Sequence, residues 1–194
     1  MIPLFLLSLI PCFSLQAHAA DYGIEEIQDL ANLPLLNPDL AQRKTAKLKL
    51  SNGLQILLIS DPGADQSASV MGVEAGSWDD PKQYPGMAHF CEHMLFMGSQ
   101  TYPNENEFSK LIADYNGQTN AFTASDRTVY MFSSKTEGFL TILDRFAHFF
   151  IDPLFNPSGI SRELHAVDQE YAKNLENDGW REHMIFKELG NPLH

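Results

Sequence analysis

Five consecutive residues, His89-Phe-Cys-Glu92-His93, combine two imidazoles and one carboxylate at short spacing. If this segment is helical, positions i, i+3 and i+4 lie on one face of the helix. The surrounding stretch from Met87 to Met97 is otherwise nearly all apolar, so the polar groups form a narrow stripe on a helix suited to burial. Buried imidazoles and carboxylates are costly without partners, and a divalent cation would supply one.

The pattern H-x-x-E-H, the inverted form of the H-E-x-x-H zinc motif, predicts a zinc site here. Two neutral imidazoles one helical turn apart can both bind one Zn²⁺. Glu92 is placed to accept a proton from water that the metal acidifies, rather than to bind the metal itself. The alternative is a polar stripe that faces solvent, although exposed stripes usually contain Lys, Glu or Gln.

A catalytic zinc site takes a third protein ligand and keeps one position open. Glu163 and Glu170 are the best source of that ligand, because they are seven residues apart and share one face of a predicted helix. One carboxylate could bind the metal while the other supports a ligand. The alternative is that both lie on a solvated helix face, where glutamates often occur at this spacing.

The composition limits the classes of protein to consider. The chain has 194 residues, with 13 Lys+Arg, 25 Asp+Glu and a formal net charge of −12. Its 44% hydrophobic and 20% charged residues are ordinary for a globular protein, and the length suggests one domain. The acidity argues against nucleic acid as a partner, because phosphate binding needs clustered Lys and Arg. After residue 20, no window has the apolar length of a membrane span.

Residues 1–19 are typical of a secretory signal peptide. They carry no charged side chain, their apolar stretch is short for a transmembrane helix, and Ala17-His18-Ala19 forms an A-x-A cleavage pattern. Because no Lys or Arg lies near the start, an uncleaved anchor or a misassigned start stays open. Export to the periplasm is expected, with an extracellular location as the alternative and no stable membrane anchor after cleavage. The mature chain would keep one cysteine, Cys91, and no internal disulfide.

The patterning along the rest of the chain predicts an α+β fold. Residues 20–44 are expected to form a leader, regular structure is expected to begin near Thr45, and Asn52-Gly53 predicts a hairpin. The predicted strands are 45–50, 54–59, 68–74 and one or two within 118–134. The predicted helices are 87–97, 104–115, 137–151, 158–174 with Ser158 as its cap, and 178–189. This order favours a sheet layered against helices.

Several spaced motifs resemble the pitrilysin/insulysin (insulinase-type) zinc metallopeptidases, which are inverzincins. The matching segments include Gly76-Ser77, Asp80-Pro81, 86–98, Tyr102-Pro103, 120–123, 143–150, 153–155, Arg162-Glu163, 166–170, Lys173-Asn174, 178–181 and 190–192. The resemblance covers residues 45–194. It implies a zinc-binding peptidase domain like that of the mitochondrial processing peptidases, with a mostly antiparallel sheet, one Zn²⁺ per chain and peptide substrates.

The same resemblance implies a role for each candidate residue. The implied zinc ligands are His89, His93 and Glu170, with Glu92 as the general base and Glu163 as a helper carboxylate near the site. The implied substrate-binding residues are Asn120 and Ala121, on an edge strand that would pair with the peptide backbone, and Phe96, Phe122 and Trp180, which would line side-chain pockets. Cys91, inside the motif, is expected to be a packed residue rather than a catalytic one.

Members of this family are several-fold longer, with four homologous domains around a closed chamber. The resemblance therefore implies that residues 45–194 are an N-terminal domain, truncated at its C-terminal end, of a longer endopeptidase or oligopeptidase. Alone, such a piece is expected to bind zinc but to turn over peptides poorly. The alternative from a different class is a non-catalytic structural or binding module of the same fold, and the intact ligand set favours the peptidase.

Overall fold

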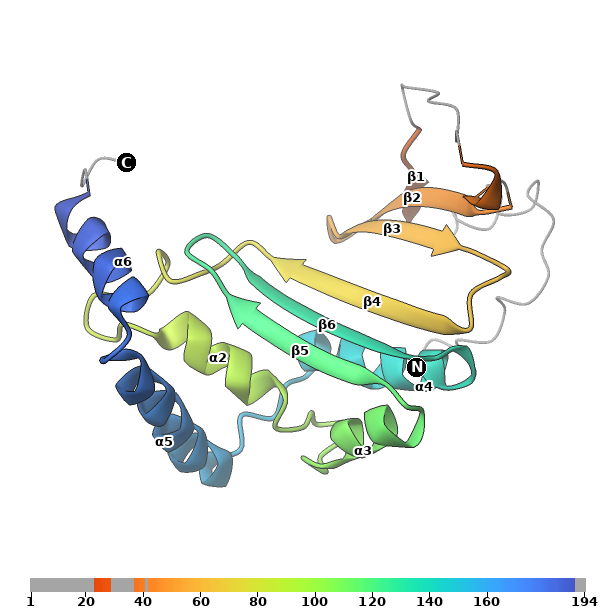
Figure 1. Cartoon of the computed structure of the whole chain (residues 1–194). Coiled ribbons are helices and arrows are strands. Elements are labelled where there is room, and N and C mark those ends of the chain that lie inside the picture. The colour runs from red at the N-terminus through yellow and green to blue at the C-terminus, as the bar shows by residue number, and fades with distance from the viewer. Residues whose placement is uncertain (1–22, 29–36, 41, 191–194) are drawn as a thin grey trace. The chain divides into compact units, whose positions relative to one another are not determined.

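The computed structural model describes residues 23–28, 37–40 and 42–190 of the chain (Figure 1). The predicted signal peptide, with its Ala17-His18-Ala19 cleavage pattern, lies outside the described residues. The chain divides into two compact units, Met1–Ala64 and Asp65–His194. Among the described helices, none combines the length and apolarity needed to cross a membrane.

The first unit contains a three-stranded antiparallel sheet in the order β1-β2-β3. Its elements are β1 (Ile24–Glu26), the 3-10 helix η1 (Pro38–Leu40), β2 (Lys44–Leu50) and β3 (Gln55–Ser60). The predicted hairpin at Asn52-Gly53 is confirmed, and Gly53 supplies the left-handed φ of 91° that the turn needs. Strand β1 corrects the expectation that regular structure begins near Thr45. A strand of three residues has no alternation long enough to detect in the sequence.

The second unit is built on an antiparallel sheet in the order β4-β6-β5. Its strands are β4 (Gln66–Val73), β5 (Gln118–Thr123) and β6 (Thr128–Lys135). Every second residue of the central strand β6 is buried from Thr128 to Ser134, as expected for a strand with one covered face. Strand β5 pairs with β6 on one side only, so it is an edge strand of this sheet.

Five helices accompany this sheet. They are α2 (Met87–Leu95), α3 (Glu107–Asp114), α4 (Thr136–Ile151), α5 (Pro157–Asn174) and α6 (Asp178–Leu189). Helices α2, α3 and α4 lie on the same side of the sheet (Figure 1). The fold is therefore the predicted α+β layer of an antiparallel sheet packed against helices.

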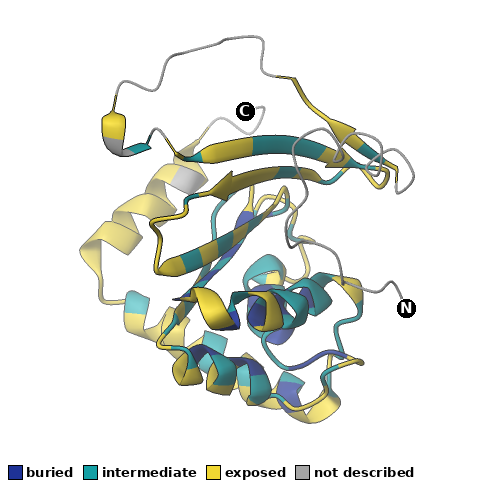
Figure 2. Cartoon of the chain, turned by 90° about the vertical axis from the view of Figure 1, so that its right-hand side faces the viewer, coloured by how far each residue is buried: buried dark blue, intermediate teal, exposed yellow. Residues whose placement is uncertain are grey.

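An aromatic core joins the sheet to helices α2, α3 and α4. The ring of Phe108 in α3 lies 4.8 Å from that of Phe149 in α4 and 6.2 Å from that of Phe132 in β6, centroid to centroid. The buried members of this core are Leu95, Phe108, Ile112, Tyr130, Phe132, Ile142, Phe146 and Phe149. The buried segments gather between the sheet and the helices (Figure 2). This packing holds α2, which carries the H-x-x-E-H residues, against the sheet.

One predicted helix start and one predicted capping residue are wrong, for local reasons. The helix expected at residue 104 begins at Glu107, because the Asn104 side chain accepts the Asn106 N–H at 3.1 Å and forms a turn instead. The cap of α5 is Asn156 rather than Ser158: Asn156 Oδ1 accepts the Ser158 N–H at 3.1 Å. Pro157 follows at the first helical position, which suits its fixed φ and its missing N–H.

Candidate metal centre

A carboxylate from the preceding loop, that of Asp80, accepts hydrogen bonds from the N–H groups at the start of helix α2. Asp80 accepts the Gly86 N–H at 2.7 Å and the Ala88 N–H at 2.8 Å, one on each oxygen. These N–H groups lie at the start of the helix, where no helical carbonyl is available to them. The negative charge of Asp80 also suits the positive end of the helix dipole. Asp80 therefore fixes where the H-x-x-E-H helix starts.

The loop that leads to α2 is held against the turn between β5 and β6. The Ser77 N–H donates to the Ala124 carbonyl at 3.0 Å, and the Trp78 N–H donates to that of Ser125 at 2.8 Å. Gly76 permits this close approach, because a Cβ there would lie 2.5 Å from the Ala124 oxygen. Helix α2 is thus tied to the end of strand β5.

His89, His93 and Glu170 come together between α2 and α5. Glu170 Oε2 lies 3.4 Å from His89 Nε2 and 3.7 Å from His93 Nε2. One ligand atom from each of the three residues lies within 4.8 Å of the other two, so the group could hold a metal ion. The Glu170 side chain is 53% exposed, which leaves the group open to solvent on the α5 side.

Glu163 shares a face of α5 with Glu170. It contacts His93 at Nδ1, whereas Glu170 lies near Nε2 of the same ring. Glu163 Oε2 lies 3.0 Å from His93 Nδ1, and both side chains are mostly buried. A carboxylate accepts hydrogen bonds, so Nδ1 donates and Nε2 of a neutral ring keeps its lone pair. Glu163 therefore orients His93 with the free nitrogen toward His89 and Glu170.

Glu92 lies on α2 between the two histidines but outside the group of three. It is only 7% exposed, and its Oε2 accepts the Thr123 hydroxyl at 2.6 Å. A second hydroxyl, that of Thr128, lies 3.4 Å from the Thr123 hydroxyl and donates to the Ala75 carbonyl. This contact links the buried carboxylate to the end of strand β5 and limits its orientation.

The residues present fit a zinc ion. Two imidazole nitrogens and one carboxylate oxygen are a common ligand set of catalytic zinc sites with three protein ligands. A carboxylate on the far nitrogen of a ligating histidine, as Glu163 is on His93, is the usual outer contact of such sites. Among the described residues, the recorded partners of Glu163 and Glu170 are histidines, and no Lys or Arg pairs with either. An added cation would therefore find uncompensated negative charge.

The predicted substrate-binding residues lie in three different surroundings. Asn120, which is exposed, and Ala121, which packs against the core, occupy the middle of the edge strand β5. Phe96 packs in the aromatic core, with its ring 5.1 Å from that of Phe149. Phe122 and Trp180 are exposed, and no ring contact among the described residues joins them to each other or to Phe96. The substrate roles of all five residues stay predictions.

Two residues that shape the centre had no predicted role. Both residues, Asp80 and Thr123, occur in the motifs of the resemblance. The partners of Asp80 lie six and eight positions away in the sequence, and Glu92, the partner of Thr123, lies 31 positions away. Spacing within a helix or strand does not reveal such contacts, because a loop and a strand end create them. Cys91 has the predicted character of a packed residue, and burial raises the pKa of its thiol.

An H-x-x-E-H pattern on a helix is typical of inverzincin zinc metallopeptidases. Residues 55–193 match the family described as Insulinase (Peptidase family M16). The chain belongs to this family of zinc peptidases, as the resemblance of its motifs predicts.

Individual relatives agree with this assignment. The chain is 46% identical to the A-factor-processing enzyme of Saccharomyces cerevisiae over 163 residues, which are 84% of this chain and 16% of the yeast protein. It is 46% identical to the insulin-degrading enzyme of Homo sapiens over 153 residues, 79% of this chain and 15% of the human protein. The crystal structure of pitrilysin superposes with a TM-score of 0.80 and 32% identity, over 89% of this chain and 18% of that chain. The chain thus spans less than a fifth of these relatives.

Proposed function

We propose that this chain is the zinc-binding region of an endopeptidase that hydrolyses peptide bonds in peptides. The observation that carries the proposal is the meeting of His89, His93 and Glu170 beside a buried carboxylate. By their names, the yeast and human relatives process A-factor and degrade insulin, which supports peptides as the substrate class. Because the chain spans only 15 to 16% of those relatives, the activity is that of the whole protein, to which further domains would contribute.

His89, His93 and Glu170 would hold the zinc ion. Glu163 keeps His93 Nε2 available by accepting the hydrogen on Nδ1. When bound, zinc supplies a Lewis acid that lowers the pKa of water and polarises a carbonyl. The open side of the group, at the half-exposed Glu170, admits water and substrate.

Glu92 is the residue that would accept the proton from the attacking water and pass it to the leaving amine. The Thr123 hydroxyl occupies its Oε2 at 2.6 Å, which leaves Oε1 for proton exchange. Because Glu92 is almost fully buried, few other orientations are available to it. A general base held in one orientation meets the geometric requirement of proton transfer.

Strand β5 would hold the substrate backbone. Its outer edge has no neighbouring strand in the sheet β4-β6-β5, and an extended peptide can add there through main-chain hydrogen bonds whatever its sequence. Asn120 and Ala121 lie in the middle of this strand, and Thr123 at its end bonds Glu92. A peptide on this edge would therefore lie beside the proposed base.

Glu92→Gln in the full-length protein tests the proposal. The amide keeps the size of the side chain but cannot accept the proton, so zinc binding should persist while peptide hydrolysis falls about 100-fold or more. Glu182→Gln, on the exposed surface of α6, is the matched control for loss of one carboxylate. Retained turnover would exclude Glu92 as the base. Absence of bound zinc from gently purified wild-type protein would instead favour a non-catalytic module.

We also propose that the protein is exported, on the sequence of residues 1–19 alone. Removal of this segment would release the chain into the periplasm or the exterior, without an anchor. The N-terminal sequence of the protein recovered from its source organism tests this proposal. A start at or near Ala20 is expected, and an intact Met1 would contradict it.

A further inference from the structure

Helix α5 supplies both Glu163 and Glu170, yet few of its residues are buried against the rest of the second unit. Gly159 is its one residue classed as buried in the described structure. The apolar side chains of Leu164 and Tyr171 are more than half exposed. In α4, by contrast, Ile142, Phe146 and Phe149 are buried in the core. The position of α5, and so of the two glutamates, depends on few contacts.

Arg162 makes the most direct of these contacts outside the candidate metal group. Its Nη2 donates to Glu105 Oε2 at 2.5 Å and lies 3.5 Å from Met97 Sδ. A Cβ added at Gly159, one turn earlier, would lie 3.8 Å from side-chain atoms of Met97 and of Met94, so this part of α5 passes close to both methionines. Arg162 therefore ties the first half of α5 to the segment that follows α2.

Glu105 lies in a loop whose position is fixed by several contacts with the rest of the second unit. In that loop the Tyr102 N–H donates to Ser99 Oγ at 2.9 Å, and Ser99 forms an isolated β-bridge with Pro153. The Tyr102 hydroxyl donates to Asp144 of α4. A guanidinium bound to this loop is attached to the core through α4, and not to a free surface segment.

We propose that Arg162 is a positioning residue of the metal centre, which through Glu105 holds α5 so that Glu163 and Glu170 face the histidines of α2. This inference rests on the proposed zinc function. Arg162 directly precedes Glu163, and Glu170 follows about 10 Å further along the helix at 1.5 Å per residue. Loss of the contact lets α5 move away from α2, and the centre then binds metal only in the fraction of molecules in which α5 is docked.

Because Arg162 is positively charged, the direction in which its removal changes zinc affinity distinguishes positioning from simple electrostatics. Electrostatics alone predicts that removing a cation from beside Glu163 tightens the binding of a divalent cation. Positioning predicts the opposite, because the ligand Glu170 is then less often in place. Arg162→Met, which keeps the length of the stem, therefore separates the two explanations by the direction of the change in zinc affinity.

The test is the zinc dissociation constant of the chain, measured by competition with a chromophoric chelator. Arg162→Met and Glu105→Gln should each weaken binding about threefold, and the double variant should be no weaker than either, because one contact is lost in all three. Arg162→Lys, which can still pair with Glu105, should recover most of the affinity. Arg43→Met, which breaks the Arg43–Asp61 ion pair of the first unit, is the matched control and should not weaken binding.

A second readout does not involve metal. In the metal-free chain, backbone amide hydrogen exchange in α5 should be faster in Arg162→Met than in wild type, and exchange in α4 should be unchanged. Unchanged or tighter zinc binding by Arg162→Met, with wild-type exchange in α5, overturns the inference and leaves the proposed function standing. A wild-type chain that binds no zinc overturns both.

Discussion

Two histidines of the second unit each pair through Nδ1 with a carboxylate at nearly the same distance. His93 Nδ1 lies 3.0 Å from Glu163, and His148 Nδ1 lies 2.8 Å from Asp152. The pairs differ in what else lies near each ring. His93 Nε2 faces Glu170, with the His89 ring 4.8 Å away, whereas the His148 ring stacks edge-on against Tyr102 at 5.1 Å. The other groups near the ring, and not the pair itself, distinguish a candidate metal ligand from a structural histidine.

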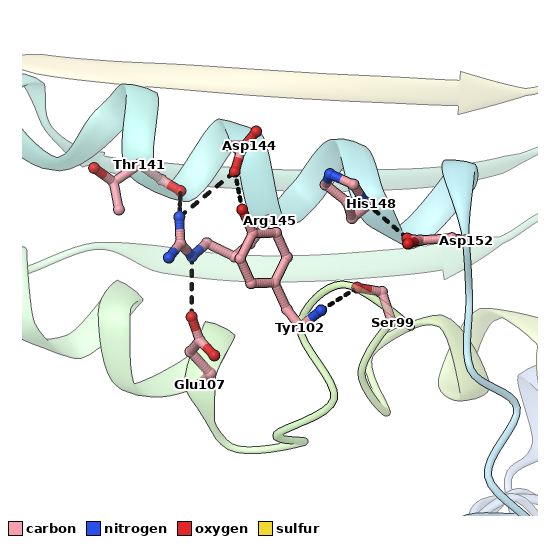
Figure 3. Close-up of polar contacts among 8 residues, drawn as sticks. All are labelled: Ser99, Tyr102, Glu107, Thr141, Asp144, Arg145, His148 and Asp152. Atoms are coloured by element: carbon pink, nitrogen blue, oxygen red, sulfur yellow. Dashed lines mark hydrogen bonds and ion pairs between the residues drawn. The ribbon is translucent and has the colours of Figure 1, made fainter. Parts of the chain in front are cut away.

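The two surroundings also differ in how negative charge is compensated. Close to His148, Arg145 supplies a cation: its Nε lies 3.0 Å from Glu107, and its guanidinium lies 4.3 Å from the centroid of the Tyr102 ring (Figure 3). The same guanidinium donates to the Thr141 carbonyl and lies 3.6 Å from Asp144. The candidate metal centre has carboxylates and imidazoles but no such cation among the described residues. The acidic groups around Arg145 thus have a cation among the described residues, whereas the candidate metal centre could take its cation from a bound metal ion.

The largest expected effect is a dependence of stability on zinc. At free zinc about 1,000-fold above its dissociation constant, the free energy of unfolding should rise by about 4 kcal/mol, because the ion binds the folded state. Urea unfolding with zinc and with a chelator measures the difference. His93→Ala should abolish it, whereas His148→Ala should preserve it. An equal zinc effect in both variants would contradict the distinction between the two histidines.

The next effect concerns the carboxylate partners. Glu163→Gln should weaken zinc binding about 10- to 100-fold, because an outer carboxylate orients the ligating ring and raises its basicity. Asp152→Asn changes the matched pair on His148 and should leave zinc affinity unchanged. Chelator competition measures both. If the two variants weaken binding equally, the carboxylates act through general stability and not through orientation of His93.

The sequence reveals the parts of the centre that lie within one helix. His89, Glu92 and His93 follow from the i, i+3, i+4 spacing, and the hairpin at Asn52-Gly53 follows from turn chemistry. Glu163 and Glu170 share a helix face, but spacing alone leaves a solvated face open. The structure brings them to the histidines through the packing of α5 on α2, which local periodicity does not encode.

Contacts between distant segments account for what the sequence does not reveal. Thr123 reaches Glu92 because β5 ends beside α2, and Asp80 caps α2 from a loop. Strand β1 consists of residues Ile24 to Glu26, which pair with the edge of β2. The start of α5 depends on a choice between two capping residues, Asn156 and Ser158, that propensity hardly distinguishes. Tertiary context decides each of these features.

A smaller effect is expected when the acidic groups around Arg145 lose their cation. Arg145→Met removes the cation that pairs with Glu107 and lies near Asp144 in a partly buried setting, which should lower the free energy of unfolding by about 1 to 2 kcal/mol. Urea unfolding of the metal-free chain measures the loss. Zinc affinity should stay within twofold of wild type. A large loss of zinc affinity would mean that these groups and the centre are not separate.

The smallest expected effect is a pH dependence of the stabilisation that Asp152, the partner of His148, gives to the fold. Burial tends to raise the pKa of Asp152, but hydrogen bonds from Thr101 and His148 outweigh it and hold the pKa below its usual 3.8. The stabilisation that this lowered pKa provides is present above about pH 3.8 and is lost as the pH falls through the folded-state value. Asp152→Asn should therefore be less stable than wild type at pH 5, by less than Arg145→Met. The gap should shrink toward pH 3.

A matched control for this pH effect lies on α6. Asp178 is 95% exposed and pairs with Arg181, so Asp178→Asn should change stability little at either pH. A gap between Asp152→Asn and wild type that stays constant from pH 5 to pH 3 would mean that the side chain acts by packing and not by charge. The same gap with and without zinc would place Asp152 outside the metal centre, because a residue linked to the ion must change stability with its binding.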